Sequence, residues 1–198
     1  MAVSLKKGEK ISLTKTNPGL KKVIVGLGWD AAARKRGLFG MFANAQSIDC
    51  DASAFLLKGG KLSGFPDVVY YGNLNHASQS VIHQGDNLTG DGDGDDEQIF
   101  VDLTSVPSEF DKIVIVANIY KAKERMQHFG MIQNAFIRIV DAANNSEMCR
   151  FSLSDDYSGM TAMIFGELYR NEGEWKFSAT GQGTKDPGLS ELCQRFMN

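Results

Sequence analysis

The chain of 198 residues is 42% hydrophobic and 23% charged, which is typical of a globular protein with enough apolar material for a sizeable core. No run approaches the roughly 18 apolar residues of a membrane-spanning helix, and the first ten residues lack the apolar stretch of a signal peptide. The three cysteines show no Cys-x-x-Cys spacing, which favours neither a disulfide framework nor a zinc site. These features predict a cytoplasmic protein with reduced thiols.

The net charge of −3 conceals a local concentration of acid. Residues 86–97 contain six acidic side chains and no Lys or Arg, so this acidic run carries −6 and the remainder of the chain +3. A nucleic-acid-binding surface would instead show clustered basic residues. The distribution predicts a cation as the ligand and no nucleic-acid partner.

Short apolar runs, rich in β-branched and aromatic residues and separated by glycines, are typical of strands. In chain order they cover 23–25, 54–57, 68–71, 99–103, 113–120, 135–140, 150–153, 161–169 and 174–180. In the last run Trp175, Phe177 and Ala179 alternate with polar residues, as in a strand with one buried face. Residues 113–117 are apolar throughout, as in a central strand covered on both faces. The predicted fold is all-β, a sandwich of two antiparallel sheets in a single domain over residues 1–198.

Two segments have helical features. Asp186-Pro187 supplies an N-cap and a proline suited to the first turn, and Leu189 then begins an apolar repeat at i, i+3, i+4 and i+7. This pattern predicts a short C-terminal helix that docks on the sandwich. A short helical turn is expected within 121–130.

Gly and Asp favour turns, so the acidic run is predicted to form a surface loop between two strands. Its carboxylates repel one another, by about 4 kcal/mol per pair at 4 Å and an effective dielectric near 20. A calcium ion, which takes six to eight oxygen ligands, would offset this repulsion. The spacing is not that of an EF-hand.

Asp49 and Asp51 are a second carboxylate pair on one face of an extended segment, and Asp30 is a further candidate ligand. The alternative is a solvated acidic turn without an ion.

The stretches 83–90 (His-Gln-Gly-Asp-Asn-Leu-Thr-Gly) and 92–97 (Gly-Asp-Gly-Asp-Asp-Glu) resemble the signature loop of the TerD-type tellurite-resistance and general-stress proteins of bacteria. Further segments resemble the family in order along the whole chain: 5–8, 16–20, 25–30, 51–54, 134–138, 166–170 and 175–177. Two departures are a longer, more basic stretch at 34–46 and Cys50 between two aspartates.

The resemblance implies a β-sandwich that binds about two calcium ions in acidic loops and acts as a binding module, not as an enzyme. Carried over by position, the implied ligands are Asp86, Asn87, Asp91, Asp93, Asp95, Asp96 and Glu97, with Asp49 and Asp51 opposite and Asp30 in addition. The expected partner is a protein of the same stress system, with no small-molecule substrate evident.

Two other functions stay open. The first is calcium-dependent docking to anionic lipid or phosphate, helped by the basic residues 34–36, which implies peripheral membrane contact. The second is a magnesium- or manganese-dependent phosphoryl-processing enzyme, although no phosphate-cradling Lys or Arg motif accompanies the carboxylates.

Overall fold

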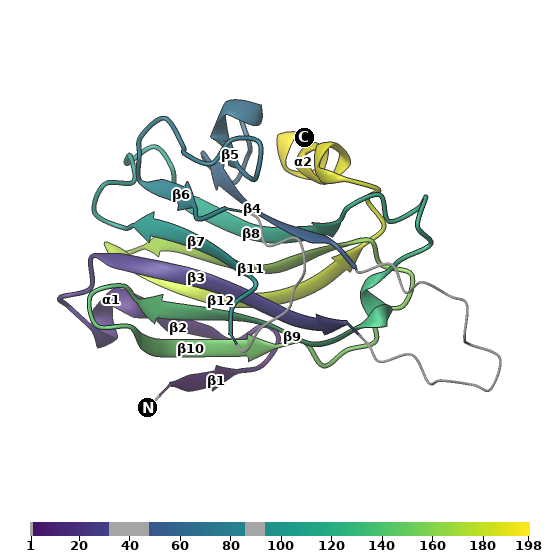
Figure 1. The fold of residues 1–198 in the computed structure, drawn as a ribbon. Coiled ribbons are helices and arrows are strands. Elements are labelled where there is room, and N and C mark those ends of the chain that lie inside the picture. Colours follow the sequence, from purple (N-terminus) through teal and green to yellow (C-terminus); the bar gives the residue numbers. More distant parts are fainter. Residues whose placement is uncertain (1, 32–47, 86–93) are drawn as a thin grey trace.

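The computed structural model describes residues 2–31, 48–85 and 94–198, and these form two stacked six-stranded sheets (Figure 1). Sheet A consists, in spatial order, of β1 (Val3–Leu5), β10 (Ser146–Ser152), β9 (Ile132–Asp141), β3 (Lys22–Ala31), β7 (Glu97–Asp102) and β6 (Val81–His83). Sheet B consists of β2 (Lys10–Ser12), β12 (Glu174–Thr184), β11 (Ala162–Asn171), β8 (Lys112–Ile119), β4 (Cys50–Leu57) and β5 (Val68–Val69). The predicted all-β sandwich is confirmed.

Within the described residues, every strand pair of the two sheets is antiparallel except β1 with β10, which is parallel. Each of the nine predicted apolar runs lies in or overlaps a strand. The strands β1, β2 and β6 were not predicted, because three residues are too few to show an alternating pattern. The helical turn expected within 121–130 is found only at the end of that range: residues 121–126 form turns, and a 3₁₀ turn, η2 (Phe129–Met131), begins at Phe129.

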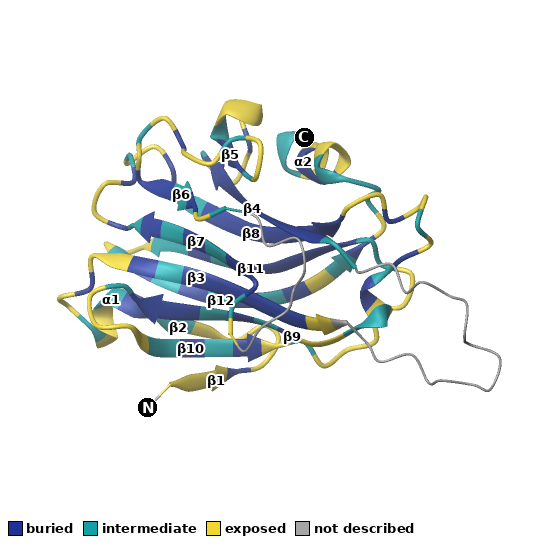
Figure 2. Ribbon diagram, viewed as in Figure 1, coloured by how far each residue is buried: buried dark blue, intermediate teal, exposed yellow. Residues whose placement is uncertain are grey.

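The main core lies between the two sheets, where the dark blue segments of Figure 2 gather. Strand β12 contributes Trp175, Phe177 and Ala179 to it, and the intervening residues are partly exposed, as the alternation predicted. Strand β8 is buried on both faces, also as predicted. Its Ile113 and Ile115 pack between the sheets, whereas Val114 packs on the opposite face of sheet B.

The outer face of sheet B is covered by the C-terminal helix α2 (Leu189–Met197). Leu192 and Cys193 are fully buried there against apolar side chains of β4, β8 and β11. The predicted helix is confirmed, but its N-cap is Gly188, while Asp186 pairs with Arg195 in the last turn. Two further short helical segments, α1 (Leu13–Thr16) and η1 (Phe65–Asp67), lie in connections. In the part of the chain that the structure describes, no helix is long and apolar enough to cross a membrane.

Strand β3 has glycines where its outer face would otherwise carry side chains. Val25 and Leu27 point into the core, so the alternating positions Gly26 and Gly28 lie on the outer face of sheet A. A methyl group on Gly26 would overlap the carboxylate of Asp95, and one on Gly28 would overlap the ring of Phe136. The two glycines therefore leave the space in which the segment at 94–96 lies against β3.

Candidate metal site

The predicted ligands that the structure describes lie where β3 ends and where β4 and β7 begin. Asp30 is exposed near the end of β3, and its Oδ2 accepts a hydrogen bond from Asn134 Nδ2 at 2.7 Å. Asp49 and Asp51 flank Cys50 at the start of β4. Asp95, Asp96 and Glu97 lead into β7. The other predicted ligands, Asp86, Asn87, Asp91 and Asp93, lie outside the described residues.

Four of these carboxylates lie near enough to one buried thiol to raise its pKa. Cys50 is 2% exposed, and burial raises the pKa of its thiol well above the usual value. Negative charges nearby raise the same pKa further; in decreasing order of effect they belong to Asp51, Asp49, Asp96 and Glu97. The two candidate groups of ligands, one before and in β4 and one before and in β7, are thus brought together, although they are distant in sequence.

Asp51 has neutral oxygen atoms beside it on the outer face of sheet B. Its cross-strand neighbour on β8, Asn118, donates from Nδ2 to Asp51 Oδ2 at 3.5 Å. Asn118 Oδ1 and the hydroxyl of Ser53 are buried and have no hydrogen-bond partner among the described residues. Hard cations such as calcium bind oxygen ligands, and a buried oxygen without a hydrogen-bond partner is free to act as one. These residues therefore fit a calcium ion.

Asp49 lies beside a positive charge. Its Oδ2 is 3.7 Å from Arg125 Nη1, and its backbone oxygen accepts from the Tyr120 backbone N–H at 2.8 Å. The second contact extends the pairing of β4 with β8 by one residue and so fixes the backbone at Asp49.

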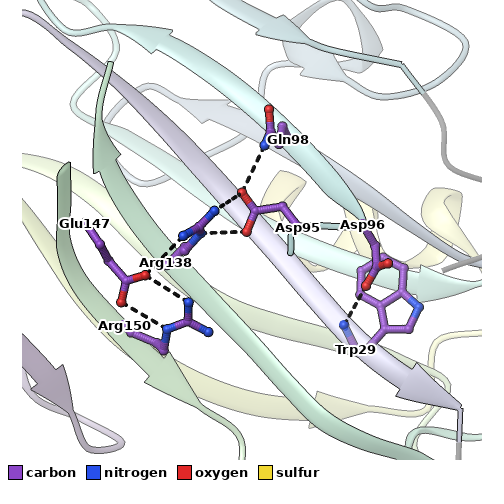
Figure 3. A network of polar contacts seen from close by, with 7 residues as sticks. All are labelled: Trp29, Asp95, Asp96, Gln98, Arg138, Glu147 and Arg150. Carbon is purple, nitrogen blue, oxygen red and sulfur yellow. Dashed lines mark hydrogen bonds and ion pairs between the residues drawn. The ribbon is translucent and has the colours of Figure 1, made fainter. Parts of the chain in front are cut away.

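Both carboxylate oxygens of Asp95 accept hydrogen bonds from side chains of sheet A. Arg138 Nε and Nη2 donate to its Oδ1 and Oδ2 at 2.7 and 3.0 Å, and Gln98 Nε2 donates to Oδ2 at 3.0 Å (Figure 3). The side chain of Asp95 is only 1% exposed. This forked, charge-assisted contact is a strong one for a guanidinium and a carboxylate.

Arg138 belongs to a chain of alternating charges across sheet A. Its Nη1 also donates to Glu147 at 3.2 Å, and Glu147 accepts two bonds from Arg150, which stacks on Phe136. The hydrogen bonds that Arg138 donates to Asp95 raise the pKa of Arg138, and those that Glu147 accepts from Arg150 lower the pKa of Glu147. Both groups therefore stay charged over the whole physiological pH range.

Asp96 and Glu97 are held on other elements. The Asp96 backbone N–H donates to Leu27 at 2.7 Å, and its Oδ2 accepts from the Trp29 backbone N–H at the same distance. Glu97 Oε2 is 2.9 Å from His83 Nε2, with both side chains 1% exposed. His83 Nδ1 accepts from Gly85 N–H, which assigns the ring proton to Nε2, facing Glu97 and Ala52.

Among residues 2–31, 48–85 and 94–198, no three His, Cys, Asp or Glu side chains form a group that could hold a metal ion. Sequence reasoning also missed the contributions of Asn118, Ser53 and Arg138. No motif signals them, because each becomes relevant through strand pairing with residues distant in the sequence. His83 is likewise a buried partner of the acidic run, through its contact with Glu97.

The thiols are expected to be inert in the folded protein. Burial raises the pKa of Cys149 and of Cys193 to about 12 and that of Cys50 well above 9.0. Native protein should therefore react with a thiol reagent such as DTNB at pH 8 far more slowly than denatured protein, which should label three thiols. Because the folded-state pKa values are raised, the stability that these thiols contribute is complete below pH 9 and falls as the pH rises towards 12. Rapid labelling of the native protein would contradict this.

Comparison with known proteins identifies the family to which this chain belongs. A family model described as the TerD domain matches residues 1–196. The chain belongs to the TerD family. It is 49% identical over 199 residues to the stress response protein SCP2 of Bacillus subtilis (strain 168), with both chains covered in full. It is also 49% identical over 197 residues to the tellurium resistance protein TerD of Serratia marcescens, covering 99% of this chain and 97% of that one.

Solved structures of the same kind share the fold. A homologue of the telluride resistance protein TerD from Streptomyces coelicolor A3(2) superposes with a TM-score of 0.61 at 20% identity, covering 85% of this chain and 92% of that one. A second crystal structure, of a protein of unknown function, gives a TM-score of 0.67 at 21% identity over 88% and 95% of the two chains. The TerD assignment thus agrees with the observed sandwich.

Proposed function

We propose that this TerD-family chain is a calcium-binding module, not an enzyme, of a bacterial stress or tellurite-resistance response. The observation that carries the proposal is the pair of buried oxygens without a hydrogen-bond partner, Asn118 Oδ1 and the Ser53 hydroxyl, close to Asp51 at the start of β4. Relatives named for stress response and for tellurium resistance, at 49% identity, support the biological setting. A cytoplasmic location and a protein partner of the same system complete the proposal.

Calcium suits this end of the sandwich because it binds hard oxygen ligands in a flexible geometry. Asp51, Asp49 and Asp96 would supply carboxylates, and Asn118 an amide oxygen. The described residues alone do not complete a metal site, so the proposal requires further ligands from Asp86, Asn87, Asp91 and Asp93. Asp30 is a further ligand of this proposal, at the end of β3. Binding would neutralise the repulsion between the carboxylates and leave that end of the molecule as a surface for the partner.

Calorimetric titration of metal-stripped protein with calcium chloride, and separately with magnesium chloride, tests this function. We expect saturable calcium binding at a stoichiometry of one or two, and weaker magnesium binding, because magnesium demands a stricter octahedral geometry. A matched titration of protein in excess EGTA is the control. Absence of calcium binding would refute the proposal, and a preference for magnesium would favour the phosphoryl-processing alternative.

A further inference from the structure

A buried histidine in the segment between β5 and β6 joins a carboxylate to a serine hydroxyl. His76 Nε2 lies 3.4 Å from Asp67 Oδ1, and His76 Nδ1 lies 2.7 Å from Ser78 Oγ. His76 is 5% exposed and its ring packs at a steep angle against the ring of Phe110, whereas Ser78 is only half-buried. A carboxylate, an imidazole and a hydroxyl in this order are the groups that activate a serine as a nucleophile.

The surrounding donors assign the protons in this group. The backbone N–H of Ser78 lies 3.2 Å from His76 Nδ1 and can only donate, so Nδ1 is an acceptor and the ring proton is on Nε2, facing Asp67. The hydroxyl of the fully buried Ser80 is 2.7 Å from Ser78 Oγ, and the Ser80 backbone N–H also donates to Ser78 Oγ at 3.4 Å. With Ser80 as the donor, the hydroxyl proton of Ser78 points at His76 Nδ1.

A tight turn holds the serine beside the histidine. The N–H of Gln79 donates to the His76 carbonyl at 2.8 Å, and the N–H of His76 donates to the Val81 carbonyl at 3.0 Å. Gln79 has a φ of 58°, in the left-handed region that glycine favours. A residue other than glycine keeps this conformation only where its surroundings hold it. The turn therefore fixes Ser78, one of its two central residues, against His76.

This group lies at the opposite end of β7 from the acidic run. The carbonyl of Ser80, which precedes β6, accepts from the backbone N–H of Asp102 at 2.8 Å. Asp102 ends β7 and Glu97 begins it, and β6 and β7 lie side by side in sheet A (Figure 1). A strand rises about 3.4 Å per residue, so the two ends of β7 are about 17 Å apart. What Ser78 does is therefore independent of the candidate metal site.

We propose that Ser78 is a nucleophile that takes up an acyl group from an activated ester or thioester, with His76 as its general base and Asp67 as the residue that orients His76. The bond from Ser78 Oγ to the acyl carbon forms, and the bond from that carbon to the leaving oxygen or sulfur breaks. The hydroxyl proton passes to His76 Nδ1 and from there to the leaving group. One acyl group is transferred per chain, so the reaction is a modification of the protein and not a catalytic cycle.

Proton transfer to His76 also frees a donor for the negative charge that develops. Acyl transfer passes through a tetrahedral intermediate with one charged oxygen, which backbone N–H groups beside the nucleophile stabilise. The Ser78 N–H donates to Nδ1 while His76 is neutral, and becomes available to the charged oxygen once Nδ1 carries a proton. Phosphoryl transfer instead spreads charge over three oxygens and relies on metal ions and cationic side chains, so an acyl group suits Ser78 better.

Exposure of the full-length protein to p-nitrophenyl acetate, followed by peptide mass spectrometry over time, tests this inference. We expect Ser78 to be acetylated at least about 100-fold faster than Ser105, an exposed serine whose hydroxyl bonds the carboxylate of Asp102 instead of an imidazole. His76→Asn keeps an acceptor for the Ser78 N–H but removes the base, and should slow acetylation of Ser78 by about 100-fold. Asp67→Asn should give a smaller loss, since the amide oxygen still accepts from Nε2–H.

Circular dichroism confirms that each variant is folded. Ser105→Ala is the matched control and should leave the acetylation rate of Ser78 unchanged, as should excess EGTA, so that this inference and calcium binding can fail separately. If His76→Asn does not fold, the comparison of Ser78 with Ser105 in the wild type still decides the matter. Acetylation of Ser78 no faster than that of Ser105, or an undiminished rate in folded His76→Asn, would overturn the inference.

Discussion

Replacing His83 with leucine should lower the free energy of unfolding by about 3 kcal/mol, because it removes the N–H that faces a buried carboxylate. His83 Nε2 lies 2.9 Å from Glu97 Oε2, and both side chains are 1% exposed. Leucine fills a similar volume without an N–H, so the buried carboxylate loses a polar neighbour that water cannot replace. Urea unfolding followed by tryptophan fluorescence measures the difference.

Two further variants show whether the contact itself is responsible. Glu97→Gln keeps an oxygen that can accept from His83 and should cost less than His83→Leu. The double variant His83→Leu with Glu97→Leu replaces the polar pair by an apolar one and should be more stable than His83→Leu alone. If the double variant is instead the less stable, the histidine contributes by packing and not by pairing with Glu97.

Calcium should raise the stability of the wild type by about 4 kcal/mol at a free concentration 1,000-fold above its Kd. For a chain of this size that corresponds to about 10 °C in melting temperature. Asp51→Asn should abolish most of this gain, because the amide carries no charge to attract the ion and Asp51 lies beside the orphaned oxygens of Asn118 and Ser53. Calorimetric melting in calcium and in EGTA measures both values.

Glu109→Gln is the matched control for this substitution. Glu109 is an exposed carboxylate, 59% accessible, that pairs with Lys58 outside the candidate site. Its removal should leave the calcium-dependent increase in melting temperature unchanged. A full increase in Asp51→Asn would remove Asp51 from the set of ligands and direct attention to the other carboxylates near Cys50.

The strands and the helix whose apolar residues recur at regular spacing were predicted well from the sequence. The alternation of Trp175, Phe177 and Ala179 gives the inward face of β12, and the uniformly apolar run at 113–117 gives the central strand β8. Both patterns follow directly from whether one or two faces of a strand are buried. The docked face of α2 was predicted for the same reason, since its apolar residues recur at helical spacing.

The contacts within the candidate site could not be predicted in the same way. Composition identified the carboxylates, but the partners of Asp51, Asp95 and Glu97 depend on which strands pair and in which register. Arg138 follows Asp95 by 43 positions, and Asn118 follows Asp51 by 67. A single sequence without strand pairings carries no signal for contacts at such separations.

The contact between His83 and Glu97 joins the two flanks of the acidic run, since the first precedes that run and the second ends it. Bringing together the ends of a free chain of this length costs about 2 kcal/mol in conformational entropy. Folding of the sandwich meets that cost, because β6 and β7, which carry the two flanks, pair in sheet A. On the proposed function, this preorganisation would spare an incoming cation the cost of closing the loop, and His83 would thereby raise the affinity of the site.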